Sequence, residues 1–155
     1  MATLHLMVGL PCSGKTTLAR ELEHTYAALR LNADEWQLRL FGQDAAEPEH
    51  DVRHSAIEAM LWEIASRALA LGTNVILDFG FWAREEREDF RSRAREIGAS
   101  SEIHYLDVAP DELLRRLAQR NAERSSTAFF IPEEMMRPWM RFFQKPTPDE
   151  LDRRD

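Results

Sequence analysis

Short apolar runs alternate with longer amphipathic stretches along this chain. Four apolar runs have the length of buried strands, and they span residues 4–8, 28–31, 74–79 and 101–108. Segments with helical periodicity occupy residues 14–26, 35–41, 52–71 and 83–97, and two more begin at Pro110 and near Ile131. Because helices separate the successive strands, the pattern predicts a three-layer α/β fold with a central parallel sheet and helices on both faces.

The middle of the chain carries finer predictions. The helix at residues 52–71 places six apolar side chains on one face, namely Ile57, Met60, Leu61, Ile64, Ala68 and Leu71. The polar stretch before it, residues 42–51, contains Gly42 and Pro48 and predicts a mobile loop. His50 and His54 border this loop without a third metal ligand, so the sequence favours an ordinary surface pair.

Length and composition limit what the chain can be. Its 155 residues fit a single domain over residues 1–155. With 27 acidic and 20 basic residues the formal net charge is −7, which disfavours a polyanionic partner such as nucleic acid. The one cysteine, Cys12, allows no internal disulfide, and no apolar run approaches the ~20 residues of a membrane span. We therefore expect a soluble cytoplasmic protein without a membrane partner.

The strongest motif directly follows the first apolar run. Residues 9–16 read GLPCSGKT and fit the pattern G-x-x-x-x-G-K-S/T at every fixed position, between a strand and a helix. Such a loop binds a nucleoside triphosphate with Mg²⁺: Lys15 reaches the β- and γ-phosphates, and the Thr16 hydroxyl enters the metal shell. The expected nucleotide-binding residues of this segment are Gly9, Pro11, Cys12, Ser13, Gly14, Lys15, Thr16 and Thr17. The alternative is a chance glycine-rich turn.

Two carboxylates lie at the carboxyl ends of later strands, where a parallel sheet places its ligands. Asp78 ends the third apolar run and is the expected second holder of Mg²⁺, unless it is a turn or capping residue. Asp34 follows the second run and can accept the proton of a hydroxyl that attacks the γ-phosphate. The sequence equally supports Asp34 as the N-cap of the helix at 35–41.

A row of arginines suggests a lid. Arg116, Arg120 and Arg124 are spaced four apart and can share one helical face, and the polar segment RSSTAFF follows them. We predict that residues 116–131 form a short arginine-bearing lid that neutralises charge and excludes water. The alternative is a solvated face.

These segments resemble those of the P-loop kinases related to polynucleotide kinase and the zeta-toxin kinases. The resemblance rests on GLPCSGKTTLAR, LNADEW, NVILDFGFWAREERE, LDVAPDELLRRLAQRNAER and IPEEMMRPWMRFFQKP, and it spans nearly the whole chain. It implies a P-loop NTPase fold, with Asp34 as the general base. It also implies that Arg120 and Arg124 clamp the phosphates of ATP from the lid.

Two departures from that family concern the acceptor. Polynucleotide kinases place an arginine three residues after the catalytic Asp, and this chain has Gln37 there. Phe79 and Gly80 replace the small polar residues expected after Asp78. The sequence therefore predicts an ATP-dependent phosphotransferase acting on a hydroxyl of a small molecule such as a nucleoside, sugar nucleotide or antibiotic. The alternatives are a kinase of nucleic-acid 5′-hydroxyl ends and a non-catalytic nucleotide-sensing switch; no N-K-x-D motif supports a GTPase.

Overall fold

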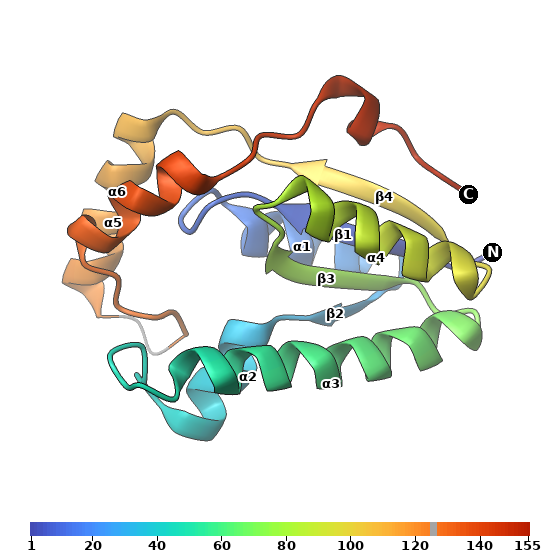
Figure 1. The fold of residues 1–155 in the computed structure, drawn as a ribbon, viewed down its shortest axis with the longest axis horizontal. Helices are drawn as coiled ribbons and strands as arrows, with labels where there is room; N and C mark the ends of the chain where they lie inside the picture. Colours follow the sequence, from blue (N-terminus) through green and yellow to red (C-terminus); the bar gives the residue numbers. More distant parts are fainter. Residues whose placement is uncertain (125–126) are drawn as a thin grey trace.

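The computed structural model describes residues 1–124 and 127–155, so Ser125 and Ser126 of the predicted lid lie outside the described residues. The strands are β1 (Thr3–Val8), β2 (Leu29–Leu31), β3 (Val75–Gly80) and β4 (Ser100–Tyr105). The helices are α1 (Lys15–Thr25), α2 (Ala33–Phe41), α3 (His50–Ala70), α4 (Arg84–Glu96), α5 (Pro110–Glu123), α6 (Glu133–Phe142) and the short 3-10 helix η1 (Pro148–Leu151) (Figure 1).

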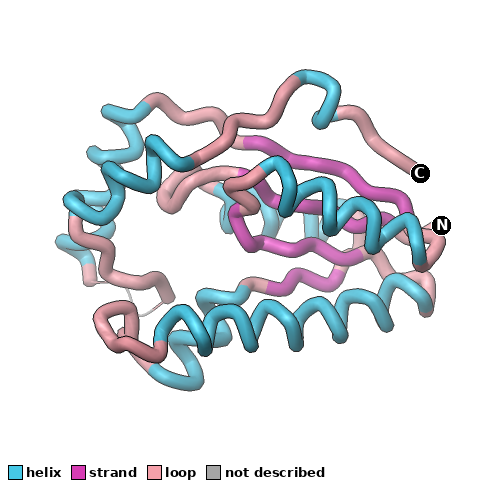
Figure 2. Tube along the Cα trace, viewed as in Figure 1, coloured by secondary structure: helices cyan, strands magenta, loops and turns pink. Residues whose placement is uncertain are grey.

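The four strands form one parallel sheet in the order β2-β3-β1-β4, which confirms the predicted α/β fold. Helices surround the sheet in Figure 2. Alternate residues of β1 face opposite sides, so that Leu4 and Leu6 pack with α3 and α4 whereas Met7 packs with α1. Helices α5 and α6 lie beyond the carboxyl ends of the strands, at the left of Figure 1.

The second helix begins earlier than the sequence predicted. It starts at Ala33, because the side chain of Asn32 accepts a hydrogen bond from the backbone N–H of Glu35 at 2.9 Å. Asn32 is therefore the N-cap, and the alternative assignment of Asp34 as the cap is wrong. Asp34 instead lies in the first helical turn, where the positive end of the helix dipole favours a carboxylate.

The buried face of α3 also differs from its prediction. Met60 is 48% exposed and Leu71 84% exposed. The buried side chains are Ile57, Leu61, Ala65 and Leu69. This stripe repeats every four residues, and Trp62, Ile64 and Ala68 beside it are partly buried and pack against the same core.

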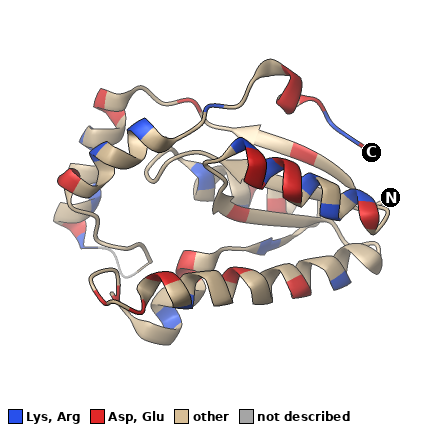
Figure 3. Ribbon diagram, in the orientation of Figure 1, with Lys and Arg blue, Asp and Glu red and all other residues tan. Residues whose placement is uncertain are grey.

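The charged helix α4 is partly buried by the C-terminal segment, which the sequence left without an element. Figure 3 shows its acidic and basic residues interleaved along the helix. Arg87 is completely buried and donates to Glu150 Oε1 at 2.8 Å and to the Phe81 carbonyl at 3.0 Å. Arg91 donates to Ser101 Oγ at 3.0 Å and to the Glu150 carbonyl. These contacts fasten η1 onto the helix.

Candidate active site

A cavity of about 1040 Å³ lies at the carboxyl ends of the strands. Its wall includes the predicted residues Pro11, Cys12, Gly14, Lys15, Thr16, Thr17, Asp34, Asp78 and Arg120. The other two predicted residues of the phosphate loop, Gly9 and Ser13, are not among the residues that line the cavity. The fold thus brings together segments that are far apart in the sequence, at the edge where parallel α/β sheets bind ligands.

The phosphate loop needs its glycines. A Cβ at Gly9 would lie 2.6 Å from Ser13 Oγ, and Gly14 has a φ of +94°. The backbone N–H of Gly9 donates to the Gly80 carbonyl at 3.0 Å, which fixes the loop against the end of β3. Helix α1 then begins at Lys15 without a side-chain cap in the described part of the chain, so its first N–H groups are available to an anion.

Lys15 extends along the loop. Its Nζ donates to the Leu10 carbonyl at 3.2 Å. Burial lowers the pKa of Lys15, and the nearby carboxylates of Asp78 and Asp34 act in the opposite direction. An anion bound at the loop would stabilise the ammonium group further.

The predicted metal residues contact each other directly. Thr16 Oγ1 donates to Asp78 Oδ2 at 2.7 Å, and Asn32 Nδ2 donates to the same oxygen at 2.8 Å. Asp78 is only 5% exposed, and its Oδ1 has no hydrogen-bond partner among the described residues. A buried carboxylate oxygen without a partner beside a hydroxyl is a donor set that suits Mg²⁺.

Asp34 projects into the same cavity from α2. Its side chain is 57% exposed and lies 3.7 Å from the imidazole of His54, measured from Oδ1 to Nδ1. The surrounding cavity walls reduce the solvation of the charged form and raise the pKa of Asp34, while the charges of His54 and Lys15 act to lower it. The carboxylate is thus held in an environment that makes it a stronger base than a free aspartate.

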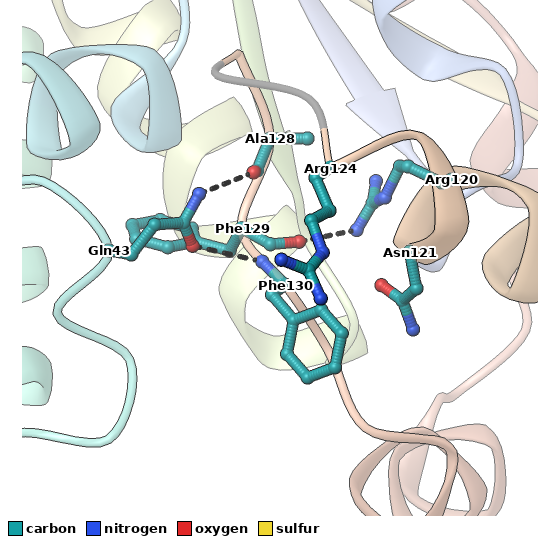
Figure 4. A pocket seen from close by; sticks show the side chains of 7 residues that line it. All are labelled: Gln43, Arg120, Asn121, Arg124, Ala128, Phe129 and Phe130. Carbon is teal, nitrogen blue, oxygen red and sulfur yellow. Dashed lines mark hydrogen bonds between the residues drawn. The ribbon is translucent and has the colours of Figure 1, made fainter.

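The three predicted arginines separate in space. Arg116 Nη1 donates to the Cys12 carbonyl at 3.2 Å and Arg120 Nη2 to the Phe129 carbonyl at 3.2 Å, and both line the cavity. Arg120 Nε is buried and has no hydrogen-bond partner within the described ranges. Arg124 ends α5 in the left-handed region, with a φ of 49°. It lines an adjoining pocket of about 380 Å³ beside Phe130, which Arg120 also lines (Figure 4).

The residue that joins the predicted lid to the loop between α2 and α3 was not predicted from the sequence. Gln43 donates from Nε2 to the Ala128 carbonyl at 2.9 Å, and its Oε1 accepts from the N–H of Phe130 at 3.0 Å (Figure 4). No local pattern marks a lone glutamine after a helix as such a contact. The side chain thereby holds the segment at residues 128–130 from the side opposite α5.

The wall of the cavity on α3 and α4 contains residues whose place there the sequence did not indicate. His50 and His54 were predicted as a surface pair, but both contact the fully buried Gln37. His54 also contacts Glu58, and the spacing of four between them was the available signal. Burial raises the pKa of Glu86 to about 7, and repulsion from Glu58 contributes. This side of the cavity is therefore rich in carboxylates.

The polar composition of the loop between α2 and α3 predicted a mobile segment, but the structure ties this loop to the core. Asp44 is completely buried and accepts hydrogen bonds from Gln37 at 3.1 Å, His50 at 2.8 Å and Arg53 at 3.1 Å. Burial acts to raise the pKa of Asp44, but these hydrogen bonds outweigh it and lower the pKa.

No helix of the described residues is long and apolar enough to cross a membrane.

Comparisons with known proteins agree with this geometry. A chain in the structure of the Pnkp1/Rnl/Hen1 RNA repair complex is 26% identical with a TM-score of 0.75, and the match covers 91% of this chain and 43% of that one. Our chain thus spans less than half of that relative's length. Kti12 from Chaetomium thermophilum, in complex with ADP-AlF3, is 20% identical with a TM-score of 0.71, over 94% of this chain and 82% of its own.

A gluconokinase from Sinorhizobium meliloti 1021 shares the fold at 16% identity and a TM-score of 0.60, over 97% of this chain and 78% of its own. The comparison with curated proteins gave no match. The family model of the AAA domain matches residues 4–146. The predicted resemblance to P-loop kinases is confirmed, and the chain belongs to the AAA domain family as a P-loop kinase-like, nucleotide-binding protein.

Proposed function

We propose that this protein is a kinase that transfers the γ-phosphoryl group of ATP to a hydroxyl group of a small molecule. The observation that carries the proposal is one cavity lined by Lys15, Asp34, Asp78 and Arg120 from four different elements. Phosphoryl transfer requires positive charge around the phosphates and a base beside the attacking hydroxyl. This cavity offers both, with the cations on α1 and α5 and the base on α2.

Each residue then has a defined part. Lys15 and Arg120 bind the transferring phosphoryl group and neutralise the charge that develops on it. The hydroxyl oxygen of the acceptor bonds to the γ-phosphorus as the bond between that phosphorus and ADP breaks. Asp34 accepts the proton that this hydroxyl loses. Thr16 and Asp78 would hold Mg²⁺, which would reduce the negative charge of the phosphates.

The acceptor side of the cavity favours a small molecule over a nucleic-acid end. Glu58 and Glu86 line it, and neither side chain can supply the positive charge that contacts to a phosphodiester chain need. Gln37, at the position where polynucleotide kinases carry an arginine, is completely buried and bonded to Asp44. A nucleic-acid 5′-hydroxyl kinase is the second candidate, favoured by the likeness to a chain of an RNA repair complex.

The test is ATP consumption by the purified protein across a panel of hydroxyl compounds and of RNA and DNA with 5′-hydroxyl ends. We expect turnover with at least one small-molecule acceptor and none with the nucleic acids. Turnover with nucleic-acid ends alone would establish the second candidate. ATP binding without turnover on any acceptor would support a nucleotide-sensing switch instead.

Lys15→Ala should lower turnover by on the order of 10²-fold or more, because the transition state loses a cation that the phosphate loop holds in place. The chain has one other lysine, Lys145, which is exposed and paired with Asp107 at 2.9 Å. Lys145→Ala is therefore the matched control, and it should leave turnover near the wild-type value. Equal turnover in wild type and Lys15→Ala would remove the phosphate-loop assignment.

The two lid arginines should differ in importance. Arg120→Ala should lower the transfer rate by roughly 10²-fold, because the Arg120 side chain lines the cavity and supplies a cation for the transferring phosphoryl group. Arg124 lines the adjoining pocket and not the main cavity, so Arg124→Ala should change the rate by less than about tenfold. Steady-state kinetics of both variants with saturating ATP give the comparison. A larger loss in Arg124→Ala would show that the lid rearranges around ATP to bring Arg124 to the phosphates.

A further inference from the structure

The buried amide of Gln37 has a fixed orientation. Its Nε2 lies 3.1 and 3.2 Å from the two carboxylate oxygens of Asp44 and 3.0 Å from the carbonyl oxygen of His50. These groups accept hydrogen bonds and cannot donate them, so the atom that faces them must be the amide nitrogen. The amide oxygen Oε1 therefore points the other way, toward His54.

Both ring nitrogens of His54 consequently face acceptors. Nδ1 lies 2.9 Å from Gln37 Oε1, and Nε2 lies 2.8 Å from Glu58 Oε1. A neutral imidazole donates from only one nitrogen, so it could satisfy only one of these two contacts. An imidazolium donates from both, and this geometry is what a protonated His54 requires.

This imidazolium lies beside the proposed base. The same Nδ1 edge is 3.7 Å from Asp34 Oδ1, and the side chains of His54 and Asp34 line the cavity together. His54 is held at two points by residues that do not touch the phosphate loop. Its charge therefore stays at a fixed place next to the Asp34 carboxylate.

We propose that His54 is a positioning residue, an imidazolium fixed by Gln37 and Glu58 that holds the Asp34 carboxylate ionised and in place beside the acceptor hydroxyl. This inference rests on the proposed function, in which Asp34 is the general base. It assigns to α3 a part in catalysis that acts through Asp34 and does not itself touch the phosphates.

The surrounding charges support this arrangement. The charged groups that face His54 are Glu58 and Asp51 on α3, Asp34 on α2 and Glu86 on α4. Those that face Asp34 are His54, Lys15 on α1, Asp78 on β3 and Arg120 on α5. The hydrogen bond to Glu58 raises the pKa of His54 above its ordinary value despite burial. Burial raises the pKa of Asp34, and His54 is its largest opposing influence.

The first test measures the protonation of His54 directly, by nuclear magnetic resonance of the ¹⁵N-labelled imidazole in the full-length protein. We expect both ring nitrogens to carry a proton at pH 7, and Glu58→Gln to lower the pKa of His54 by removing its negative partner. Glu63→Gln, on the exposed face of the same helix, is the control and should leave this pKa unchanged. A neutral His54 at pH 7 in the wild type would overturn the proposal.

The second test is the pH profile of kcat/KM for the acceptor identified by the panel. In His54→Gln the acidic limb should move to higher pH by on the order of one unit, because Asp34 loses a neighbouring cation that favours its ionised form. The KM for ATP should stay at the wild-type value, and His24→Gln, in the exposed last turn of α1, should leave the whole profile unchanged. An unmoved acidic limb in His54→Gln would overturn the proposal.

A third measurement separates this inference from the proposed function. The Asp34 carboxyl can be titrated by ¹³C resonance without any acceptor or ATP, in wild type, His54→Gln and Glu58→Gln. We expect its pKa to rise in His54→Gln even if no acceptor is ever found. Identical titration of Asp34 in wild type and His54→Gln would overturn the positioning role while leaving the kinase assignment intact.

Discussion

Asp34→Asn should lower phosphoryl transfer by roughly 10²–10⁴-fold while ATP and Mg²⁺ bind as tightly as in wild type. Asparagine has nearly the same shape but cannot accept the proton of the acceptor hydroxyl. The phosphate loop, Thr16 and Asp78 are untouched by the change. Calorimetry with ATP and Mg²⁺ and the rate of transfer to the acceptor, measured on the same preparation, give the two quantities.

The structure makes this experiment sharper than the sequence did. Asn32 caps α2, so a loss of rate in Asp34→Asn cannot be attributed to a lost helix cap. Asp111→Asn is the matched control, because Asp111 is an exposed first-turn aspartate of α5. It reproduces the change in helix-dipole interaction without touching the cavity, and its rate should be that of wild type. If ATP affinity falls together with the rate, Asp34 is a metal or structural residue and not the base.

Glu150→Gln should lower the free energy of unfolding by about 3–5 kcal/mol, because it leaves the buried guanidinium of Arg87 without its counter-ion. Both side chains are completely buried, and Arg87 Nε lies 2.8 Å from Glu150 Oε1. Glutamine keeps the size of the side chain and removes the charge. Urea denaturation followed by circular dichroism measures the difference.

The neighbouring Asp149 provides the control. It pairs with Arg84 at 3.2 Å, but its side chain is 64% exposed, so Asp149→Asn should lower the free energy of unfolding only slightly. A loss in Glu150→Gln as small as this would contradict the importance of the buried pair. Burial acts to raise the pKa of Glu150, yet the hydrogen bonds from Arg87 and Thr147 lower it. The contribution of Glu150 is therefore present above its unfolded pKa and is lost as the pH falls through the lower, folded value.

The Arg87 contacts also reach the cavity. Arg87 holds the carbonyl of Phe81, a residue with a φ of 44° directly after β3, and Phe81 lines the cavity beside Gly80. The C-terminal segment thus supports the end of the strand that carries Asp78. A destabilised Glu150→Gln protein should for this reason be assayed well below its unfolding temperature.

Local patterns were sufficient for the phosphate loop, the four strands and the expectation that Asp34 and Asp78 share one site. A glycine-rich turn between a strand and a helix depends on residues that are adjacent in the chain. Parallel strands then bring their carboxyl ends to one edge, whatever connects them. For this reason the fold and the family were predicted correctly, and Lys15, Thr16, Asp34, Asp78 and Arg120 line one cavity.

Long-range packing decided the rest. Arg116, Arg120 and Arg124 repeat identically along α5, but the end of the helix at Arg124 turns that side chain into a second pocket. Gln37 and His54 are 17 residues apart, and only the packing of α2 against α3 makes them partners. Arg87 and Glu150 are separated by 63 residues. Periodicity describes the environment along one element, whereas these contacts depend on which elements pack together and in what register, and a repeat of 3.6 residues carries no such information.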